Sequence, residues 1–269
     1  MANVLSEPAL PNSASRSSEV LLERTSVPEC DLALEAKAAA QADPCDPEKW
    51  IKYGRALRRQ MMHREAIEAY CMGISYSPFY PLLYRHRAHA YINIGEYAVS
   101  AATFEIALRL DPSNWDCWYH QGVAYYLSGQ YERAVTSFKA CFGRTDLFDD
   151  DIATKDWLWL SLMHLGRTEE AARVVADVKP GHPVQYADCG YYNRVLVYNG
   201  TITPEEAMKV AESGDAHLYA TAAYGISYYY LCKGEKDKAY EILKKIDAGE
   251  SWGGFAEHAG RRDFANWEQ

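Results

Sequence analysis

Four arginines in the first third of the chain could bind an anion: Arg55, Arg58, Arg59 and Arg85. A guanidinium presents two parallel N–H donors, which match the two oxygens of a carboxylate or a phosphate. The whole chain has a formal net charge of −9, so this cluster of positive charge stands out against its background. We therefore expect an acidic ligand near these arginines, unless they pair with Asp and Glu side chains on a solvated face.

The chain also holds 21 tyrosines. Tyrosines at helical spacing usually pack in a core, but a flat ring with a hydroxyl also suits the lining of a groove. An aromatic groove with a few converging polar groups is typical of small-molecule sites as well. A protein-binding groove and a small-molecule pocket therefore both stay open as interpretations.

The sequence lacks the motifs of the common metal, cofactor and catalytic sites. His86 and His89 lie three residues apart, but no second pair of ligands accompanies them, so we expect no metal. The run Asp149-Asp150-Asp151 lacks the alternating ligands and the glycine of a calcium loop. There is no GxSxG, P-loop or GxGxxG motif, so the sequence indicates no cofactor.

Composition and charge narrow the class of protein. An acidic chain is a poor partner for nucleic acid, which binds basic surfaces. No apolar run reaches the roughly 18 residues that a membrane span needs. The seven cysteines are scattered without a CxxC pair. That distribution predicts reduced thiols and a cytoplasmic location.

A repeat of 34 residues organises the chain, and Trp50, Tyr84 and Trp118 fall in register at this spacing. The columns that follow hold a small residue (Gly54, Ala88, Gly122), a turn residue (Met61, Gly95, Gly129) and a second-helix aromatic (Tyr70, Phe104, Phe138). The small residue lets two helices approach closely, and the turn glycine can adopt the left-handed conformation that ends a helix. The later turn glycines Gly166, Gly200 and Gly234 keep the same spacing in a weaker pattern.

These columns resemble the tetratricopeptide repeat family, most closely over residues 47–148. The resemblance implies an all-α fold, a right-handed superhelical solenoid of helix-turn-helix repeats with helical caps. We expect a disordered leader over residues 1–25 and a capping helix over residues 26–45. About six hairpins should follow over residues 46–250.

The segment 251–269 is the least typical part of the chain, because it holds Phe255, Phe264 and Trp267. A solenoid needs its terminal apolar face covered, which favours an end cap. The alternative is a tail that inserts into the groove of the array.

In tetratricopeptide repeat proteins the first helix of each hairpin lines the concave face, where ligands bind. Carried onto this chain, the resemblance gives ten ligand-binding candidates: Arg55, Arg59, Arg85, His89, Tyr119, Tyr126, Arg194, Tyr198, Tyr224 and Tyr228. Some members of the family clamp a terminal carboxylate there, and Asn93 and the arginines match part of that clamp.

Two functions are consistent with these residues. The first is a protein-interaction adaptor whose groove seats an acidic peptide tail or a carboxylate-bearing small molecule. The second is a cofactor-free cyclase or isomerase, for example a pericyclic cyclase of natural-product biosynthesis. In that enzyme residues 251–269 would close the groove, Arg194 or Arg85 would anchor a carboxylate, and tyrosines would polarise a carbonyl. No catalytic residue can be assigned from the sequence.

Overall fold

The computed structural model describes residues 27–183, 190–251 and 253–267. The leader predicted over residues 1–25 lies outside the described residues. All regular secondary structure in the described ranges is helical, and these ranges contain no strand. The prediction of an all-α repeat fold is confirmed.

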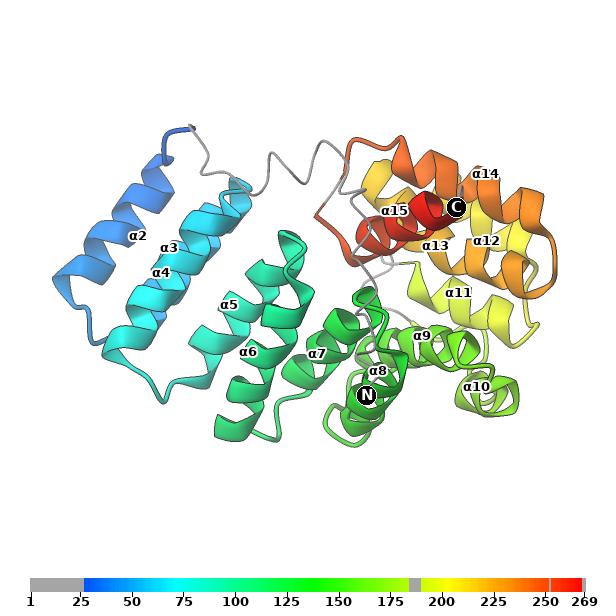
Figure 1. Cartoon of the computed structure of the whole chain (residues 1–269), viewed down its shortest axis with the longest axis horizontal. Helices are drawn as coiled ribbons and strands as arrows, with labels where there is room; N and C mark the ends of the chain where they lie inside the picture. Colours follow the sequence, from blue (N-terminus) through cyan, green and yellow to red (C-terminus); the bar gives the residue numbers. More distant parts are fainter. Residues whose placement is uncertain (1–26, 184–189, 252, 268–269) are drawn as a thin grey trace, which may run out of the picture.

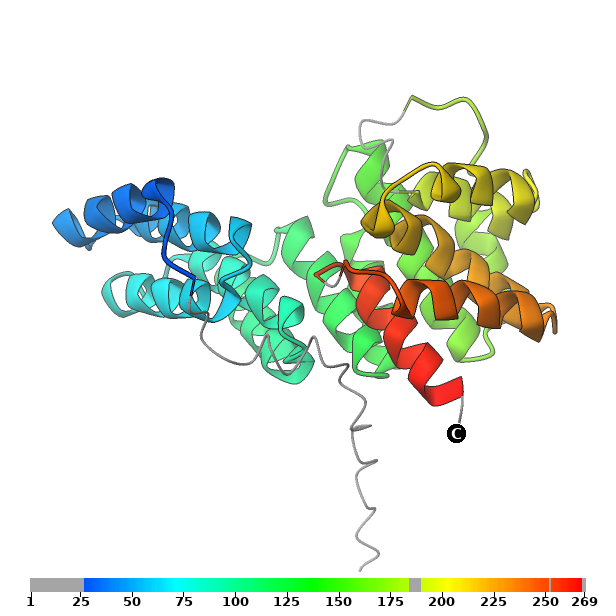
Figure 2. The same ribbon diagram turned by 90° about the horizontal axis from the view of Figure 1, so that it is seen from above.

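The helices of the array follow one another as hairpins joined by short turns. The six pairs are α3 (Pro47–Arg59) with α4 (His63–Tyr76), α5 (Pro81–Asn93) with α6 (Tyr97–Leu110), α7 (Trp115–Leu127) with α8 (Tyr131–Cys141), α9 (Phe148–His164) with α10 (Thr168–Val175), α11 (Tyr191–Tyr198) with α12 (Pro204–Glu212), and α13 (Ala216–Cys232) with α14 (Lys236–Asp247). Before them α2 (Asp31–Ala42) packs on α3, and after them comes α15 (Phe255–Trp267). Figure 1 shows the pairs stacked along an arc, and Figure 2 shows the same stack from above.

Local sequence explains where the first helices begin and end. α3 starts at Pro47, whose missing N–H costs nothing in the first turn, and the Asp46 side chain accepts a hydrogen bond from the Glu48 N–H at 3.0 Å. α5 ends before Gly95, which has a φ of 80°, a left-handed conformation that suits glycine. In the first pair the same turn is made by Met61, at a φ of 62°.

The repeated small residue explains how each hairpin closes. A Cβ atom placed on Gly54 would lie 2.2 Å from Cε1 of Tyr70, and one on Gly122 would lie 2.6 Å from Cε1 of Phe138. The first helix therefore leaves room for the aromatic ring of the second helix. This contact accounts for two of the columns seen in the sequence.

The buried apolar residues form two clusters that divide at α5. One cluster lies in α2–α5, around Leu57 and Tyr70. The other extends from α5 to α15, around Phe104, Trp157 and Tyr224. We call α2–α5 the N-terminal region and α6–α15 the C-terminal region.

The last helix lies on the inner side of the arc. α15 packs against α13 and α14 and also reaches α7 (Figure 1). Because α7 and α13 are first helices of their pairs, α15 covers the concave face of the C-terminal region. Within the described ranges no helix combines the length and the apolar composition that crossing a membrane requires.

Candidate functional site

Three arginines of α3, which we call the α3 arginine patch, lie at the open end of the concave face. Arg55 and Arg59 are exposed, and Arg58 is partly buried. None of the three forms an ion pair with an Asp or Glu of the described residues. The positive charge of this patch is therefore not neutralised by the described part of the chain.

Arg58 is held in place by neutral groups. Its Nη2 lies 2.8 Å from Nδ1 of His89 and donates to Oδ1 of Asn93 at 3.0 Å. The guanidinium also lies close to the hydroxyl of Tyr70, but no hydrogen bond of normal geometry satisfies either that hydroxyl or the Nε of Arg58. Buried donors in native proteins are normally paired. The site thus has two buried donors that remain available to an acceptor.

The electrostatics of the patch favour an incoming anion. Burial lowers the pKa of Arg58, and the nearby positive charges of Arg85 and Arg55 lower it further. Burial raises the pKa of Tyr70 to about 12, so its hydroxyl keeps its proton. Burial, reinforced by Arg58, holds the pKa of His89 well below its usual value, so this ring is neutral and can accept from Arg58.

Arg85 differs from the patch because the next repeat already neutralises it. Its Nη2 donates to Oδ1 of Asp116 at 2.8 Å, and its Nε contacts the other oxygen of the same carboxylate. His120 Nδ1 lies 3.2 Å from this carboxylate as well. Burial alone would raise the pKa of Asp116, but His120 and Arg85 hold it well below its usual range. Arg85 therefore has its carboxylate partner within the array.

The tail of the chain meets the concave face beside Arg58. Nδ2 of Asn93 donates to the carbonyl of Gly253 at 2.7 Å, so a groove side chain binds a main-chain carbonyl of the tail. The ring of Phe255 packs 5.5 Å from His89 and 5.4 Å from His120, between their centroids. His89, one of the expected ligand-binding residues, is thus in contact with the chain's own tail.

Two further candidates, Tyr126 and Tyr224, belong to a buried hydrogen-bond network that holds α15. Their hydroxyls lie 2.6 Å apart, and Tyr224 donates to Oδ2 of Asp263 at 2.8 Å. Arg262 donates from Nη1 to the carbonyl of Tyr126 at 2.8 Å. Both tyrosines are fully buried. Through these bonds α15 occupies the polar groups of both side chains.

Arg194 lies in the core and Tyr198 packs against it, in contrast to the expectation that they line the groove. Arg194 is 0% exposed, and its Nη2 lies 2.7 Å from Asp156 Oδ2. Its Nε lies 3.2 Å from the Tyr198 hydroxyl, whose ring stacks on Trp159 at 3.8 Å between centroids. Burial raises the pKa of Asp156 to about 6 even with this guanidinium beside it. Because Asp156 of α9 supplies a carboxylate, Arg194 stays buried in the core, where a ligand in the groove would not reach it.

The last two candidates, Tyr119 and Tyr228, do not converge on a ligand-sized pocket. Tyr119 is buried and stacks on Trp115 at 4.9 Å between centroids. Tyr228 borders a hollow of about 200 Å³ that His164 and Asp263 also line. Drug-sized ligands usually occupy roughly 300–1,000 Å³. The tyrosines of the enzyme hypothesis are thus engaged in packing, not in lining a pocket of that size.

Sequence reasoning missed the tail residues Gly253, Arg262 and Asp263 and the second-helix residue Tyr70. The sequence does contain a signal for the tail. The charged pair Arg262-Asp263 adjoins Phe264, in a segment whose aromatic residues can pack against the array. Tyr70 was seen only as a packing aromatic. No group of three or more His, Cys, Asp or Glu side chains in the described ranges is close enough to hold a metal ion.

Comparison with known sequences agrees with the geometry of the hairpins. The sequence profile of the tetratricopeptide repeat family matches residues 86–141, from within α5 to the end of α8. Residues 86–141 thus match tetratricopeptide repeats, and the helical hairpins on either side of them share that fold.

A curated relative shares part of this tetratricopeptide array. Anaphase-promoting complex subunit 3 of Schizosaccharomyces pombe is 26% identical over 104 residues, which are 39% of this chain. The match spans only 16% of the length of that subunit. It therefore concerns the repeats and not the subunit as a whole.

Solved structures show the same fold along most of the array. A tetratricopeptide repeat protein from Parabacteroides merdae is 19% identical and aligns with a TM-score of 0.55, over 87% of this chain and 91% of its own. YrrB, described as having an unusual peptide-binding site, is 18% identical with a TM-score of 0.50, over 84% of this chain and 98% of its own. At these identities the likeness concerns the fold alone.

Proposed function

We propose that this protein is a protein-interaction adaptor that binds an acidic peptide segment of a partner on the concave face of its N-terminal region. The observation that carries the proposal is the α3 arginine patch, which has no carboxylate partner in the described part of the chain. Arg58 offers a buried Nε, and Tyr70 offers a buried hydroxyl beside it. A carboxylate there would satisfy these donors through charge-assisted hydrogen bonds.

The tail supports a peptide as the ligand. Asn93 already binds the carbonyl of Gly253, as it would bind the main chain of an extended peptide. Peptide binding is also named for YrrB, which has the same fold. A peptide that ran along α3 and α5 would meet the tail at Asn93. The subsite for its acidic residues would therefore lie within the N-terminal region.

We infer further that the protein works in a reducing compartment such as the cytoplasm. The support is that six cysteines of the described ranges are free thiols, and that Cys117 and Cys141 among them are buried. Burial raises the pKa of each of these two thiols to about 12, which keeps them unreactive.

A double variant of the α3 arginine patch and a surface control test the subsite for the acidic residues of the peptide. The probe is a fluorescein-labelled peptide of alternating Glu and Leu, measured by anisotropy against a peptide of alternating Gln and Leu. We expect the Glu peptide to bind at least 10-fold more tightly, and the double variant Arg55→Ala/Arg58→Ala to lose that preference. Arg109→Ala, on the exposed surface of α6, removes a positive charge elsewhere and should leave binding unchanged. Equal affinity for both peptides, or loss of binding in Arg109→Ala, would reject the subsite.

A further inference from the structure

Arg58 of the α3 arginine patch is bonded to side chains of α5 that also hold the end of the chain. Its Nη2 lies 2.8 Å from Nδ1 of His89 and donates to Oδ1 of Asn93 at 3.0 Å. Nδ2 of the same Asn93 donates to the carbonyl of Gly253 at 2.7 Å. One amide group thus links the guanidinium of the patch to the segment that leads into α15.

The two hydrogen bonds of Asn93 require the same orientation of its amide. The oxygen must point toward Arg58 and the nitrogen toward Gly253, so a rotation by about 180° would break both bonds. Asn93 is 4% exposed, which leaves little water to replace a lost partner. Each bond therefore favours the orientation that the other bond needs.

Phe255 makes a second contact between α15 and the neighbours of Arg58. The centroid of its ring lies 5.5 Å from that of His89. If α15 detached, His89 and Asn93 would both lose a contact that fixes them, and Arg58 would be held less firmly. A guanidinium that is already held in place loses less side-chain entropy when it binds an anion. Docked α15 therefore prepares Arg58 for its ligand.

The packing of α15 allows it to detach while the array stays folded. Its buried residues are Ala256, Glu257, Ala259 and Gly260, which are small or polar, and its large aromatic residues are only partly buried. A hollow of about 200 Å³ also remains between α13, α14 and α15. A terminal helix that buries little apolar surface opens at less cost than the core. α15 is thus an element with a docked and a detached state.

We propose that binding of an acidic peptide at the α3 arginine patch and docking of α15 stabilise each other, with Asn93 as the positioning residue that links them. This inference rests on the proposed function, because it assigns a regulation to the same site. The factor by which docking of α15 raises the affinity for the peptide must equal the factor by which the peptide favours docking. Coupled sites commonly show factors of about 5 to 150, and a link through one amide should lie near 5. A second partner that pulled α15 away would thereby weaken the acidic peptide.

Hydrogen exchange of the full chain measures the docking of α15 directly. The probe is the peptide of alternating Glu and Leu at a saturating concentration, and the peptide of alternating Gln and Leu is the reference. Amides of α15 should exchange about 5-fold more slowly with the Glu peptide. Amides of α10, which packs on α9 and α11, should exchange at an unchanged rate. Equal slowing of α10 and α15 would indicate general stabilisation and would overturn the link.

A pair of variants that preserve charge separates the link through Asn93 from direct contact between the peptide and α15. Arg58→Lys keeps the positive charge but loses the planar guanidinium, which can serve an anion and α5 at the same time. Arg59→Lys makes the same change at an exposed position of the patch. With saturating Glu peptide, Arg59→Lys should keep the 5-fold slowing of α15, and Arg58→Lys should lose it. The same slowing in both variants would overturn the role of Asn93.

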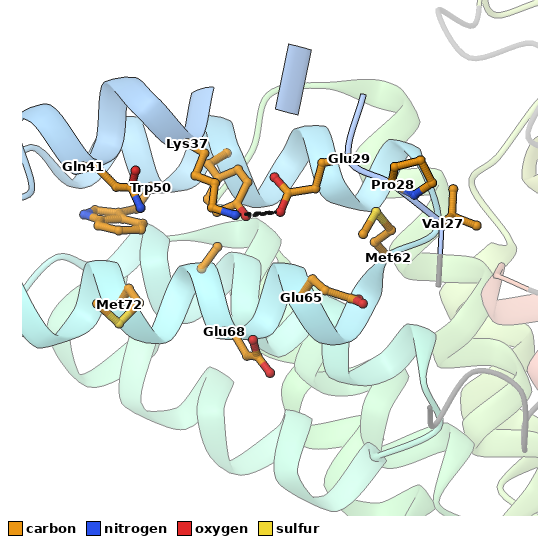
Figure 3. A pocket seen from close by; sticks show the side chains of 12 residues that line it. Val27, Pro28, Glu29, Lys37, Gln41, Trp50, Met62, Glu65, Glu68 and Met72 are labelled. Atoms are coloured by element: carbon orange, nitrogen blue, oxygen red, sulfur yellow. Dashed lines mark hydrogen bonds and ion pairs between the residues drawn. The ribbon is translucent and has the colours of Figure 1, made fainter. Parts of the chain in front are cut away.

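The opposite side of α3 distinguishes binding at the patch from binding elsewhere. A groove of about 500 Å³ lies there between α2 and α4, and Figure 3 shows its wall, with Lys37 paired to Glu29 at 2.8 Å. None of its lining residues belongs to α5 or α15. A Glu peptide bound in this groove would leave the exchange of α15 unchanged, which would overturn the link.

The two measurements keep this inference apart from the proposed function. If anisotropy shows equal affinity for the Glu and Gln peptides, the proposed function fails and the link fails with it. If the Glu peptide binds more tightly and the exchange of α15 does not change, only the link fails.

Discussion

Arg58 on α3 and Arg194 on α11 both lie on the first helix of a repeat, but their surroundings are opposite. Arg58 is partly buried beside neutral His89, Asn93 and Tyr70, with no carboxylate among the described residues. Arg194 is fully buried against Asp156. An arginine on a first helix thus lacks a carboxylate partner among the described residues in one region and is paired within the core in the other.

The concave faces of the two regions differ in the same way. In the C-terminal region Tyr126 and Tyr224 bind α15 through Arg262 and Asp263. In the N-terminal region the tail contacts Asn93 and His89 and comes close to Met61. Since a surface that binds the chain itself is not available to another molecule, the comparison favours the N-terminal end for the partner binding that we propose.

The largest effect on stability should come from removing Arg194. Arg194→Ala leaves the carboxylate of Asp156 buried without its partner, and breaking a buried pair typically costs about 3–5 kcal/mol. Arg55→Ala, on the exposed surface of α3, should change the free energy of unfolding by no more than about 0.5 kcal/mol. Urea denaturation followed by circular dichroism measures both.

A double variant distinguishes the lost pair from lost packing. Replacing both partners, as in Asp156→Leu/Arg194→Met, removes both charges and should recover most of the stability lost in Arg194→Ala. If the double variant is as unstable as the single one, the ion pair is not the cause. If Arg55→Ala is as destabilising as Arg194→Ala, the contrast between the two regions is wrong.

The second prediction concerns the acid sensitivity of the α15 interface. Burial lowers the pKa of His63, His164 and His258 to about 4 in each case. The unfolded chain therefore binds more protons between about pH 4 and 6.5, so the stability from these histidines is present above pH 6.5 and is lost as pH falls toward 4. At pH 5 the loss should be about 2 kcal/mol for each histidine.

The groups around these histidines set the size of the effect. Arg58 adds to the lowering at His63 and Arg262 at His164, whereas Asp263 near His164 and Glu257 near His258 oppose it. His217, whose pKa is raised mainly by its hydrogen bond to Glu257, acts in the opposite direction. Urea denaturation and hydrogen exchange of α15 at pH 7 and pH 5 should show the net loss. Since burial also lowers the pKa of His86 and His89, His258→Gln should reduce the loss by about a fifth. A pH-independent stability would contradict the prediction.

The sequence predicted the repeats well because each column has a local cause. Gly54 and Tyr70 are 16 residues apart and meet within one hairpin, so the 34-residue period records their contact directly. The turn glycines mark left-handed residues, as Gly95 shows. A pattern that depends on neighbours in the chain is visible in one sequence.

The candidate site was harder to predict because its contacts join distant parts of the chain. Nothing near Arg194 in the sequence shows that Asp156, on α9, will pair with it. The link from Asn93 to Gly253 spans 160 residues. The arginine patch could be identified, because its members lie within one helix and lack nearby acids on the same face, but the partners of the later candidates depend on how the repeats stack.

The prediction with the smallest expected effect asks whether glycine is also the more stable turn residue in the first repeat, which has Met61 there. This residue has a φ of 62° in the turn between α3 and α4, where later repeats have glycine. A left-handed residue with a Cβ costs about 1–2 kcal/mol, and glycine loses part of that gain through its greater freedom in the unfolded chain. Met61→Gly should therefore raise the free energy of unfolding by about 0.5–1 kcal/mol.

The reverse change in the second repeat is the matched control for Met61→Gly. Gly95 has a φ of 80°, and a Cβ added there meets no atom within 4 Å, so Gly95→Ala changes only the backbone preference. It should lower the free energy of unfolding by a similar amount. If Met61→Gly destabilises the protein while Gly95→Ala behaves as expected, then the Met61 side chain stabilises more than its backbone costs. Its proximity to Gly253 would then make it a contact between the first repeat and the tail, and the boundary between the two regions would move toward the N-terminus.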